Sequence, residues 1–256
     1  MCELFGVTSS SKLELNELLW EFFSHGIEHP NGWGMAFFYG NAVSLEKQPE
    51  ASHKSSYLKQ RLQFKVEADK MIAHIRLATR GNLNYENTHP FVMRDCSNRT
   101  WTLAHNGTIF DCDLLNPFAY SQQGQTDSER ILSYIISRIN SELEKKKELS
   151  EQERFELIDT IMCEISPENK VNLLLFDGEL MYVHTNYQNS LYTYKNGDTV
   201  VISTKPLNHK VWENVPMNTL IAYRDGKQVY TGTDHKNEFF ETEEKMRLLF
   251  LDFANL

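Results

Sequence analysis

The sequence predicts an α+β protein in which antiparallel sheets are covered by helices. Strand patterns come first, two consecutive helical patterns follow, and further strand patterns come after them. Such segregation is typical of α+β proteins rather than of alternating βαβ units. Glycine follows Asp177, Asn196 and Asp225, and these pairs are strong hairpin signals in the later strands. No internal repeat or Pro- or Gly-rich linker is present, so residues 1–256 are expected to form a single domain.

The first half of the chain predicts strands around one helix. Ser11 and Glu14 have the spacing of a capping box, and apolar residues at helical spacing follow them. Those residues are Leu15, Leu18, Leu19, Phe22 and Phe23. Strands are expected at 2–9, twice within 33–48 around Gly40-Asn41, at 71–79 and at 100–105. The polar loop 80–98 is long enough to be functional.

The second half predicts two helices and then mostly strands. Thr126 and Glu129 form a second capping-box pattern ahead of the first of these helices. The two apolar helical faces are Ile131, Leu132, Ile135, Ile136 and Ile139, and then Phe155, Ile158, Met162 and Ile165, with a solvated charge run at 142–148 between them. Strands are expected at 172–176, 181–185, 191–194, 200–204, 220–224 and 228–232, and a final helix at about 239–254.

Composition limits the classes of partner. With 26 basic against 35 acidic residues the net charge is −9, which argues against binding to nucleic acid or to an anionic membrane. The N-terminus shows no signal peptide, and no apolar run approaches the roughly 18 residues of a membrane helix. The four cysteines form no C-x-x-C pair, which favours a reducing, cytoplasmic location. The nine histidines lack metal-binding spacing, so neither a metal nor another cofactor is expected.

Cys2 is the sharpest candidate for chemistry. The small second residue permits removal of Met1, which would leave a thiol and a free α-amine on the same residue. An α-amine has a pKa of about 7.7–8.0, so near neutral pH it can accept the thiol proton directly or through one water molecule. The competing interpretation is a structural cysteine, since buried cysteines are common.

Three further positions could complete a site around Cys2. The Asn106 amide and the Gly107 N–H, at the end of a predicted strand, are donors that an oxyanion requires, although Asn-Gly is also an ordinary turn. Arg76 lies in an apolar strand, where it either pairs with a buried acid or holds a carboxylate by two parallel hydrogen bonds. Asp127 starts a helix, so it either complements the helix dipole or holds a substrate ammonium.

Taken in order, these residues resemble the class II glutamine amidotransferases, the N-terminal-nucleophile glutaminase domains. The motifs are Cys2, H-x-x-G-W-G at 29–34, R-x-A-T-x-G at 76–81, N-x-H-P-F at 87–91, L-x-H-N-G-x-I at 103–109 and T-D-S-E at 126–129. The opening and the length are most similar to free-standing bacterial members that carry no synthase domain. The resemblance implies a four-layer αββα sandwich of two antiparallel sheets between helices.

The resemblance also implies residue roles. Cys2 would attack the γ-amide of glutamine and form a γ-glutamyl thioester, with Asn106 and Gly107 as the oxyanion hole. Arg76 would bind the α-carboxylate and Asp127 the α-ammonium. Thr79 and His89 match positions that line the same pocket.

Two departures from the family pattern touch the stretch that closes over glutamine. Leu77 stands where an aromatic residue is usual, and Arg80 stands where histidine is common in synthase-fused members. A cation at Arg80 could recognise a second carboxylate on a larger γ-glutamyl compound.

Three functions therefore remain open from the sequence. The chain is a glutaminase that releases ammonia to a separate synthase subunit, a stand-alone hydrolase of another γ-glutamyl amide or peptide, or a non-catalytic interaction protein that keeps the fold and Met1. The sequence leaves homo-oligomerisation open.

Overall fold

The computed structural model describes residues 2–78 and 81–247 of the chain. Its helices are α1 (Asn16–Ser24), α2 (Ser56–Arg61), α3 (Asp127–Lys145) and α4 (Glu151–Ile165), with 3-10 turns at His25–Ile27 and Asp113–Tyr120. Its strands are β1 (Glu3–Glu14), β2 (Trp33–Tyr39), β3 (Ala42–Gln48), β4 (Glu67–Ile75), β5 (Phe91–Arg94), β6 (Thr100–His105), β7 (Leu173–Phe176), β8 (Met181–His184), β9 (Tyr192–Asn196), β10 (Thr199–Ser203), β11 (Glu213–Asn214), β12 (Ile221–Arg224) and β13 (Lys227–Thr231).

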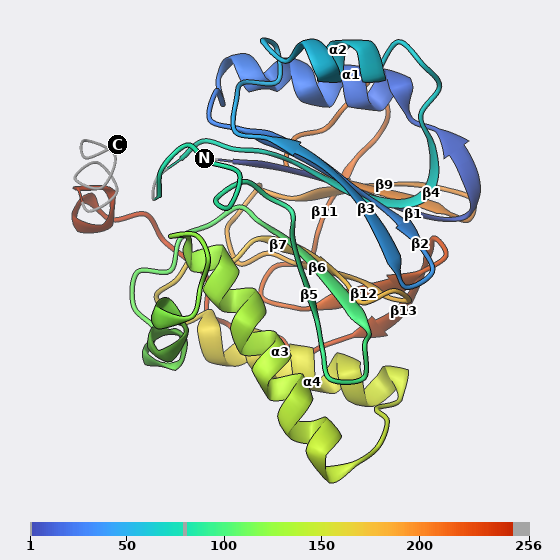
Figure 1. Ribbon diagram of the computed structural model, residues 1–256. Coiled ribbons are helices and arrows are strands. Elements are labelled where there is room, and N and C mark those ends of the chain that lie inside the picture. The colour runs from blue at the N-terminus through green and yellow to red at the C-terminus, as the bar shows by residue number, and fades with distance from the viewer. Residues whose placement is uncertain (1, 79–80, 248–256) are drawn as a thin grey trace.

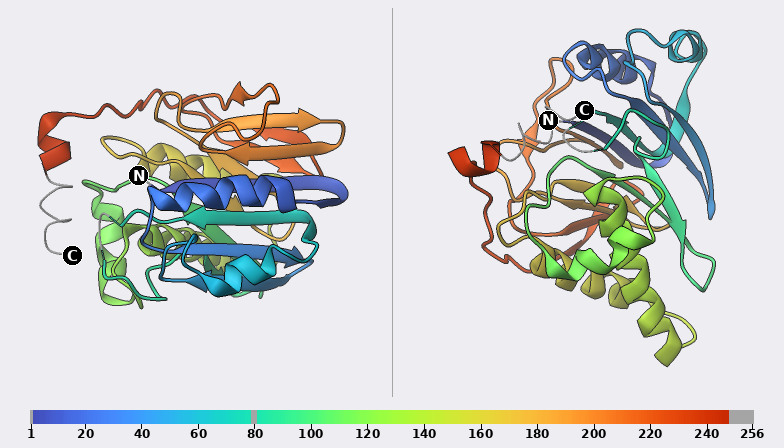
Figure 2. Two further views of the ribbon diagram at one scale, coloured as in Figure 1. Left: turned by 90° about the horizontal axis from the view of Figure 1, so that it is seen from above. Right: turned by 60° about the vertical axis from the view of Figure 1, so that its left-hand side comes forward.

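Two antiparallel sheets pack face to face between two layers of helices (Figure 1). The strand order is β11-β9-β10-β1-β4-β2-β3 in the first sheet and β13-β12-β8-β7-β6-β5 in the second. Helices α1 and α2 cover the outer face of the first sheet, and α3 and α4 cover the outer face of the second (Figures 1 and 2). The α+β prediction and the αββα sandwich implied by the resemblance are therefore confirmed.

Strand β1 shows how alternating side chains build these layers. Phe5 and Val7 point toward α1, where the Phe5 ring lies 5.5 Å from the ring of Phe22. Leu4 points the other way and packs between the sheets with Leu174 of β7. Because successive strand residues face opposite sides, one buried strand supplies both cores.

The two predicted capping boxes have different outcomes. The one at Ser11 and Glu14 is wrong, because β1 continues through Glu14 and α1 begins after Leu15 without a side-chain cap. Pairing of the end of β1 with β4 outweighs the local capping signal. The prediction at Thr126 is confirmed in its first half, since the Thr126 hydroxyl accepts a hydrogen bond from the Glu129 N–H at 3.3 Å.

The other predicted elements are found close to their expected positions. The hairpins at Asp177, Asn196 and Asp225 join β7 to β8, β9 to β10 and β12 to β13. The sequence interpretation missed α2, β5 and β11, which are all short. The final predicted helix is helical over 243–247, and its remaining residues lie outside the described part of the chain.

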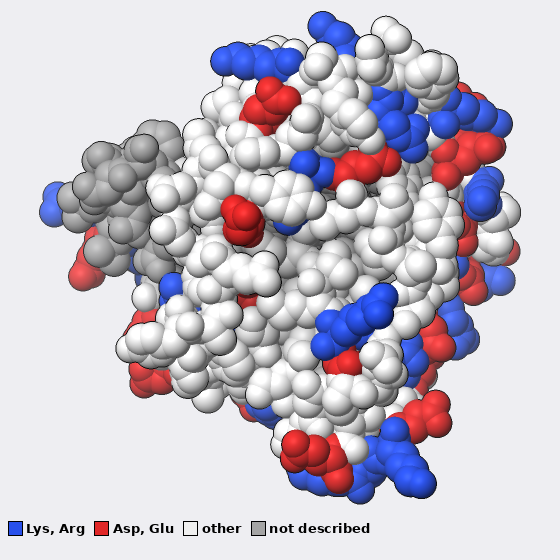
Figure 3. Space-filling model, in the orientation of Figure 1, with Lys and Arg blue, Asp and Glu red and all other residues white. Residues whose placement is uncertain are grey.

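On the face drawn in Figure 3, acidic and basic side chains are interspersed around the rim, and neither sign forms a continuous stripe among the described residues. No helix in residues 2–78 and 81–247 has the length and hydropathy needed to span a membrane.

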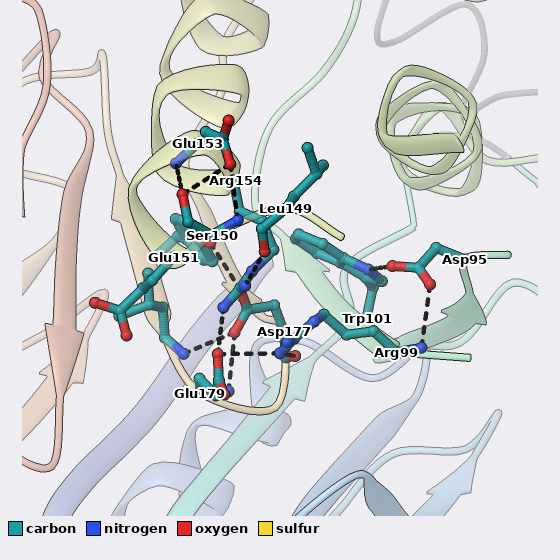
Figure 4. Close-up of polar contacts among 12 residues, drawn as sticks. Asp95, Arg99, Trp101, Leu149, Ser150, Glu151, Glu153, Arg154, Asp177 and Glu179 are labelled. Atoms are coloured by element: carbon teal, nitrogen blue, oxygen red, sulfur yellow. Dashed lines mark hydrogen bonds and ion pairs between the residues drawn. The ribbon is translucent and has the colours of Figure 1, made fainter. Parts of the chain in front are cut away.

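A buried ion pair fastens α4 to the turn between β7 and β8 (Figure 4). Arg154 is only 3% exposed, and its Nε donates to the Asp177 carboxylate at 2.8 Å. Its other nitrogens donate to the Leu149 carbonyl at 2.9 Å and to Glu179. Asp177 is fully buried and also accepts a hydrogen bond from the Tyr182 hydroxyl at 2.9 Å. The pair is therefore hydrogen-bonded on both sides, as a buried charge pair must be.

We expect Asp177→Ala to lower the free energy of unfolding by about 3–5 kcal/mol, because it leaves the Arg154 charge buried without its carboxylate partner. Arg224→Ala is the matched control, since it removes an exposed ion pair with Glu151 and should cost less than about 1 kcal/mol. Urea unfolding of the three proteins measures both values. Equal losses in the two variants would contradict this role of the buried pair.

Candidate active site

The candidate catalytic residues lie at strand ends that meet at one edge of the sandwich. Cys2 precedes β1, Arg76 follows β4 and Asn106 follows β6. Strands β1 and β4 pair antiparallel, so the start of one lies beside the end of the other. The second sheet approaches at the same edge, where the His74 ring nitrogen Nε2 lies 3.3 Å from the carbonyl oxygen of His105. Residues more than 100 positions apart therefore meet around Cys2.

The Cys2 thiol lies against the backbone of Leu77. The Leu77 N–H donates to Sγ at 3.3 Å, and the thiol donates to the Leu77 carbonyl at 3.4 Å. Burial raises the pKa of the Cys2 thiol, and the Leu77 contact and the Arg76 charge offset this only in part. The thiol is therefore protonated near neutral pH and needs a base to become a nucleophile.

Asn106 and Gly107 lie in the same cavity as Cys2. Asn106 is 4% exposed, and its N–H donates to the Asn172 carbonyl at 2.8 Å. Its side-chain oxygen has no hydrogen-bond partner among the described residues. A Cβ at Gly107 would lie 1.9 Å from the carbonyl oxygen of Lys170. Only glycine fits at this close backbone approach, so the pair is more than an ordinary turn.

Arg76 holds the loop beside Cys2. It is 2% exposed, and its guanidinium donates to the carbonyl oxygens of Gly81 and Asn82 at 3.0 Å each. Its own backbone N–H donates to the Gly32 carbonyl at 2.8 Å. Its charge acts on Cys2 and on Asp127. The sequence left open whether Arg76 pairs with a buried acid. In the structure, burial lowers the pKa of Arg76, and the negative charge of Asp127 raises it against that lowering.

Asp127 is the first residue of α3 and is 9% exposed. Its Oδ2 accepts a hydrogen bond from the Ile109 N–H at 2.8 Å, and its Oδ1 accepts one from the Ser128 hydroxyl at 3.3 Å. The carboxylate therefore complements the helix dipole and also fixes the strand end that carries Asn106. Its negative charge contributes to the raised pKa of the Cys2 thiol.

The other predicted binding residues are less directly connected to the thiol. The His89 ring stacks on the His74 ring with centroids 4.1 Å apart. Within residues 2–78 and 81–247, neither His89 nitrogen has a hydrogen-bond partner. His89 is not among the described residues that line the Cys2 cavity. Thr79 and Arg80 lie outside the described residues, as does Met1.

The structure also brings to the cavity residues that the sequence analysis missed. They come from the segment after β6, from the segment between α4 and β7, and from the C-terminal segment: Thr108, Phe110, Lys170, Phe239, Glu241, Lys245 and Met246. The cavity measures about 30 Å³, which is room for about two water molecules. Lys170 lies three residues before the buried strand β7, and a lysine in this position is a signal that the sequence contained. The contacts of the C-terminal segment depend on long-range folding.

The histidines near the site are buried and neutral. Burial, with the nearby Arg76 charge, lowers the pKa of His74 to about 3, and burial also lowers the pKa of His89 and His105. Within residues 2–78 and 81–247, no group of three or more His, Cys, Asp or Glu side chains is arranged to hold a metal ion.

The sequence pattern that defines the class II glutamine amidotransferases matches residues 1–196. A relative from Haemophilus influenzae, named "Putative glutamine amidotransferase", is 28% identical over 257 residues, which cover 90% of this chain and 86% of the relative. YafJ of Escherichia coli, which carries the same description, is 29% identical over 191 residues, covering 73% of this chain and 74% of YafJ.

A solved structure shows the same fold. Glutamine phosphoribosylpyrophosphate amidotransferase from Bacillus subtilis superposes with a TM-score of 0.65 at 18% identity. The match covers 90% of this chain and 48% of that one, so this chain spans about half the length of the amidotransferase.

We expect the buried histidines to make stability depend on pH. A folded pKa of about 3 for His74 lies below the ordinary value of 6.5, so the unfolded chain binds a proton that the folded chain does not. The resulting stability is present above about pH 6.5 and is lost as the pH falls toward 3. His74→Gln should reduce the slope of unfolding free energy between pH 6 and 4 by about 1.4 kcal/mol per pH unit.

Urea unfolding at several pH values measures this slope. The wild type, unfolded at the same pH values, is the reference. An unchanged slope in His74→Gln would show that this ring is charged in the folded protein.

Proposed function

The chain belongs to the class II glutamine amidotransferases, and from this membership we propose that it hydrolyses the γ-amide of glutamine through a γ-glutamyl thioester on Cys2. Ammonia is released when the thioester forms, and water then frees glutamate. The observation that carries the proposal is the shared cavity of the Cys2 thiol, Asn106 and Gly107. A nucleophile and two oxyanion donors in one cavity are the parts that acyl transfer needs.

The nucleophile is activated by its own α-amine in this proposal. Removal of Met1 exposes that amine, which takes the thiol proton and later gives it to the departing ammonia. The raised pKa of the Cys2 thiol supports the need for such a base. The α-amine has an unperturbed pKa of about 7.7–8.0 and is therefore partly unprotonated at neutral pH.

The oxyanion is stabilised by the Asn106 side-chain amide and the Gly107 N–H. The Asn106 N–H donates to the Asn172 carbonyl at 2.8 Å. On the other side of Gly107, Thr108 and Lys170 exchange two backbone hydrogen bonds of 3.0 and 3.1 Å. Donors held in place before the reaction need no reorganisation when the negative charge develops on the carbonyl oxygen.

Charged groups beside the thiol anchor the amino-acid end of glutamine. The Arg76 guanidinium, bonded to neutral carbonyls of the loop, attracts the α-carboxylate, and Asp127 attracts the α-ammonium. Thr79 and His89 complete the pocket in this proposal. One cation and one anion suit a zwitterionic amino acid.

The fate of the ammonia separates two forms of the proposal. A glutaminase subunit would pass ammonia to a separate synthase, and its activity alone would be low. A stand-alone hydrolase would turn over without a partner. A chain that keeps Met1 would lack the free α-amine and would be inactive, which the mass of the purified protein distinguishes.

We expect the purified chain, with Met1 removed, to release ammonia from L-glutamine, and Cys2→Ala to abolish the release. Alanine also permits removal of Met1, so the two proteins have matched N-termini. Cys96→Ala is the control, because Cys96 is exposed and should be dispensable. Ammonia release that persists in Cys2→Ala would refute the proposed nucleophile.

We expect Asn106→Ala to lower kcat for glutamine about 10²- to 10³-fold with a smaller change in KM, because the amide acts on the oxyanion rather than on bound glutamine. Steady-state kinetics measure the two effects separately. If KM instead rose by about 10²- to 10³-fold and kcat stayed unchanged, the result would assign Asn106 to substrate binding.

A further inference from the structure

The segment 106–111, which carries both oxyanion donors, is hydrogen-bonded at all of its backbone N–H groups except one. The acceptors are the carbonyls of Asn172 and Lys170, the Asp127 carboxylate and the side-chain oxygen of Asn169. The Gly107 N–H is the exception, since it has no acceptor within residues 2–78 and 81–247. Gly107 lines the Cys2 cavity. Because backbone N–H groups inside proteins are almost always paired, this N–H is left for a group that enters the cavity.

Asn169 supplies two of the hydrogen bonds that hold this segment, and the chemistry derived above does not use it. Its Oδ1 accepts from the N–H groups of Phe110 and Asp111 at 2.7 and 3.1 Å. Its Nδ2 donates to the Asp111 carbonyl at 2.7 Å. Asn169 is 1% exposed, and an amide that is buried and bonded through both of its polar atoms keeps one orientation.

The same side chain is anchored to the end of α4. Nδ2 also donates to the carbonyls of Ile165 and Pro167 at 3.0 Å each, and the Asn169 N–H donates to the Ser166 carbonyl at 3.1 Å. The last carbonyls of a helix have no partner within the helix, so this amide caps α4. Ile165 is fully buried in the core between α4 and the second sheet. Asn169 therefore connects a firmly packed helix end to the oxyanion segment.

The direction of the Gly107 N–H depends on such connections. A glycine has no Cβ to restrict its backbone, so its peptide group turns easily unless the flanking residues are held. Asn106 is held on one side by Asn172, and the bonds of Thr108 to Lys170 and of residues 110–111 to Asn169 hold the other side. A displacement of about 1 Å at a catalytic group can lower the rate about 10²-fold.

We propose that Asn169 is a positioning residue of the oxyanion hole, which holds segment 108–111 so that the Gly107 N–H points at the carbonyl oxygen of the bound amide. The inference deepens the proposed function and rests on it. Asn169 is not among the described residues that line the Cys2 cavity, so it acts through the backbone of the segment and not on the substrate. A brace that served folding alone would change stability and leave the rate of the folded enzyme unchanged.

The kinetic test compares two substitutions at this position. Asn169→Ala should lower kcat for glutamine about 10- to 100-fold and leave KM within about threefold, because the oxyanion forms only during the reaction. Asn169→Asp keeps an accepting oxygen for both N–H groups, and its second oxygen faces carbonyls, where the buried acid is protonated and donates. It should keep kcat within about threefold of the wild type. An unchanged kcat in Asn169→Ala, or an equal loss in both variants, would overturn the inference.

Asn16→Ala is the matched control. The Asn16 amide makes the same kind of brace, since it accepts from the Val66 N–H at 2.7 Å and donates to the carbonyls of Leu62 and Phe64 at 2.8 and 2.9 Å. It lies beyond the end of β1 that is opposite to Cys2. Its loss should lower the free energy of unfolding, measured in urea, and leave kcat within about twofold. A loss of kcat equal to that in Asn169→Ala would assign the effect to general loosening and overturn the inference.

A measurement without substrate separates this inference from the proposed function. ¹⁵N relaxation of the Gly107 amide should give an order parameter of about 0.85 in the wild type, as for rigid backbone, and a fall toward about 0.6 in Asn169→Ala. That result with no turnover of glutamine by the wild type would refute the proposed function and keep the positioning of the N–H. An equally ordered Gly107 amide in both proteins would overturn the inference whatever the turnover.

Discussion

The antiparallel pairing of β1 with β4 is the constraint on which the rest of the structure depends. It holds Cys2, one residue before β1, against the backbone of Leu77, two residues after β4. The same strand sends Leu4 into the core between the sheets and Phe5 under α1. A shift of one residue in this pairing would exchange those faces and move the thiol away from the loop that Arg76 holds. The stability of the fold and the position of the Cys2 thiol therefore depend on one set of contacts.

Burial determines the chemistry that this position permits. It raises the pKa of the Cys2 thiol and lowers that of His74, so neither a thiolate nor an imidazolium is present at neutral pH. The charges at Arg76, Asp127 and Lys170 are therefore the fixed electrostatic features around the thiol. Because charge interactions are stronger in a buried site than in water, these three groups contribute strongly to the electrostatic potential at the thiol.

The sequence predicted the strand-rich frame and the residues next to strand ends, because period-two hydrophobicity and Asx-Gly turns are local signals. The prediction from sequence was wrong or incomplete where contacts between distant residues override local signals. The capping pattern at Ser11 was overridden by the pairing of β1 with β4, and α2 was too short for a clear period. Lys170 and Glu241 could not be joined to Cys2 from the sequence, because only the fold brings positions 2, 170 and 241 together. The catalytic and binding roles remain predictions for all of the site residues named from the sequence: Cys2, Arg76, Thr79, His89, Asn106, Gly107 and Asp127.

The central claim is that Cys2 with a free α-amine forms a covalent acyl intermediate. The most direct measurement is intact mass, followed by peptide mass, of the Met1-processed chain quenched in acid during reaction with L-glutamine or γ-L-glutamylglycine. The account predicts an added mass of one γ-glutamyl group on the N-terminal peptide, absent in Cys2→Ala. Turnover with an unmodified Cys2 at every quench time, or the adduct on another residue, would contradict it.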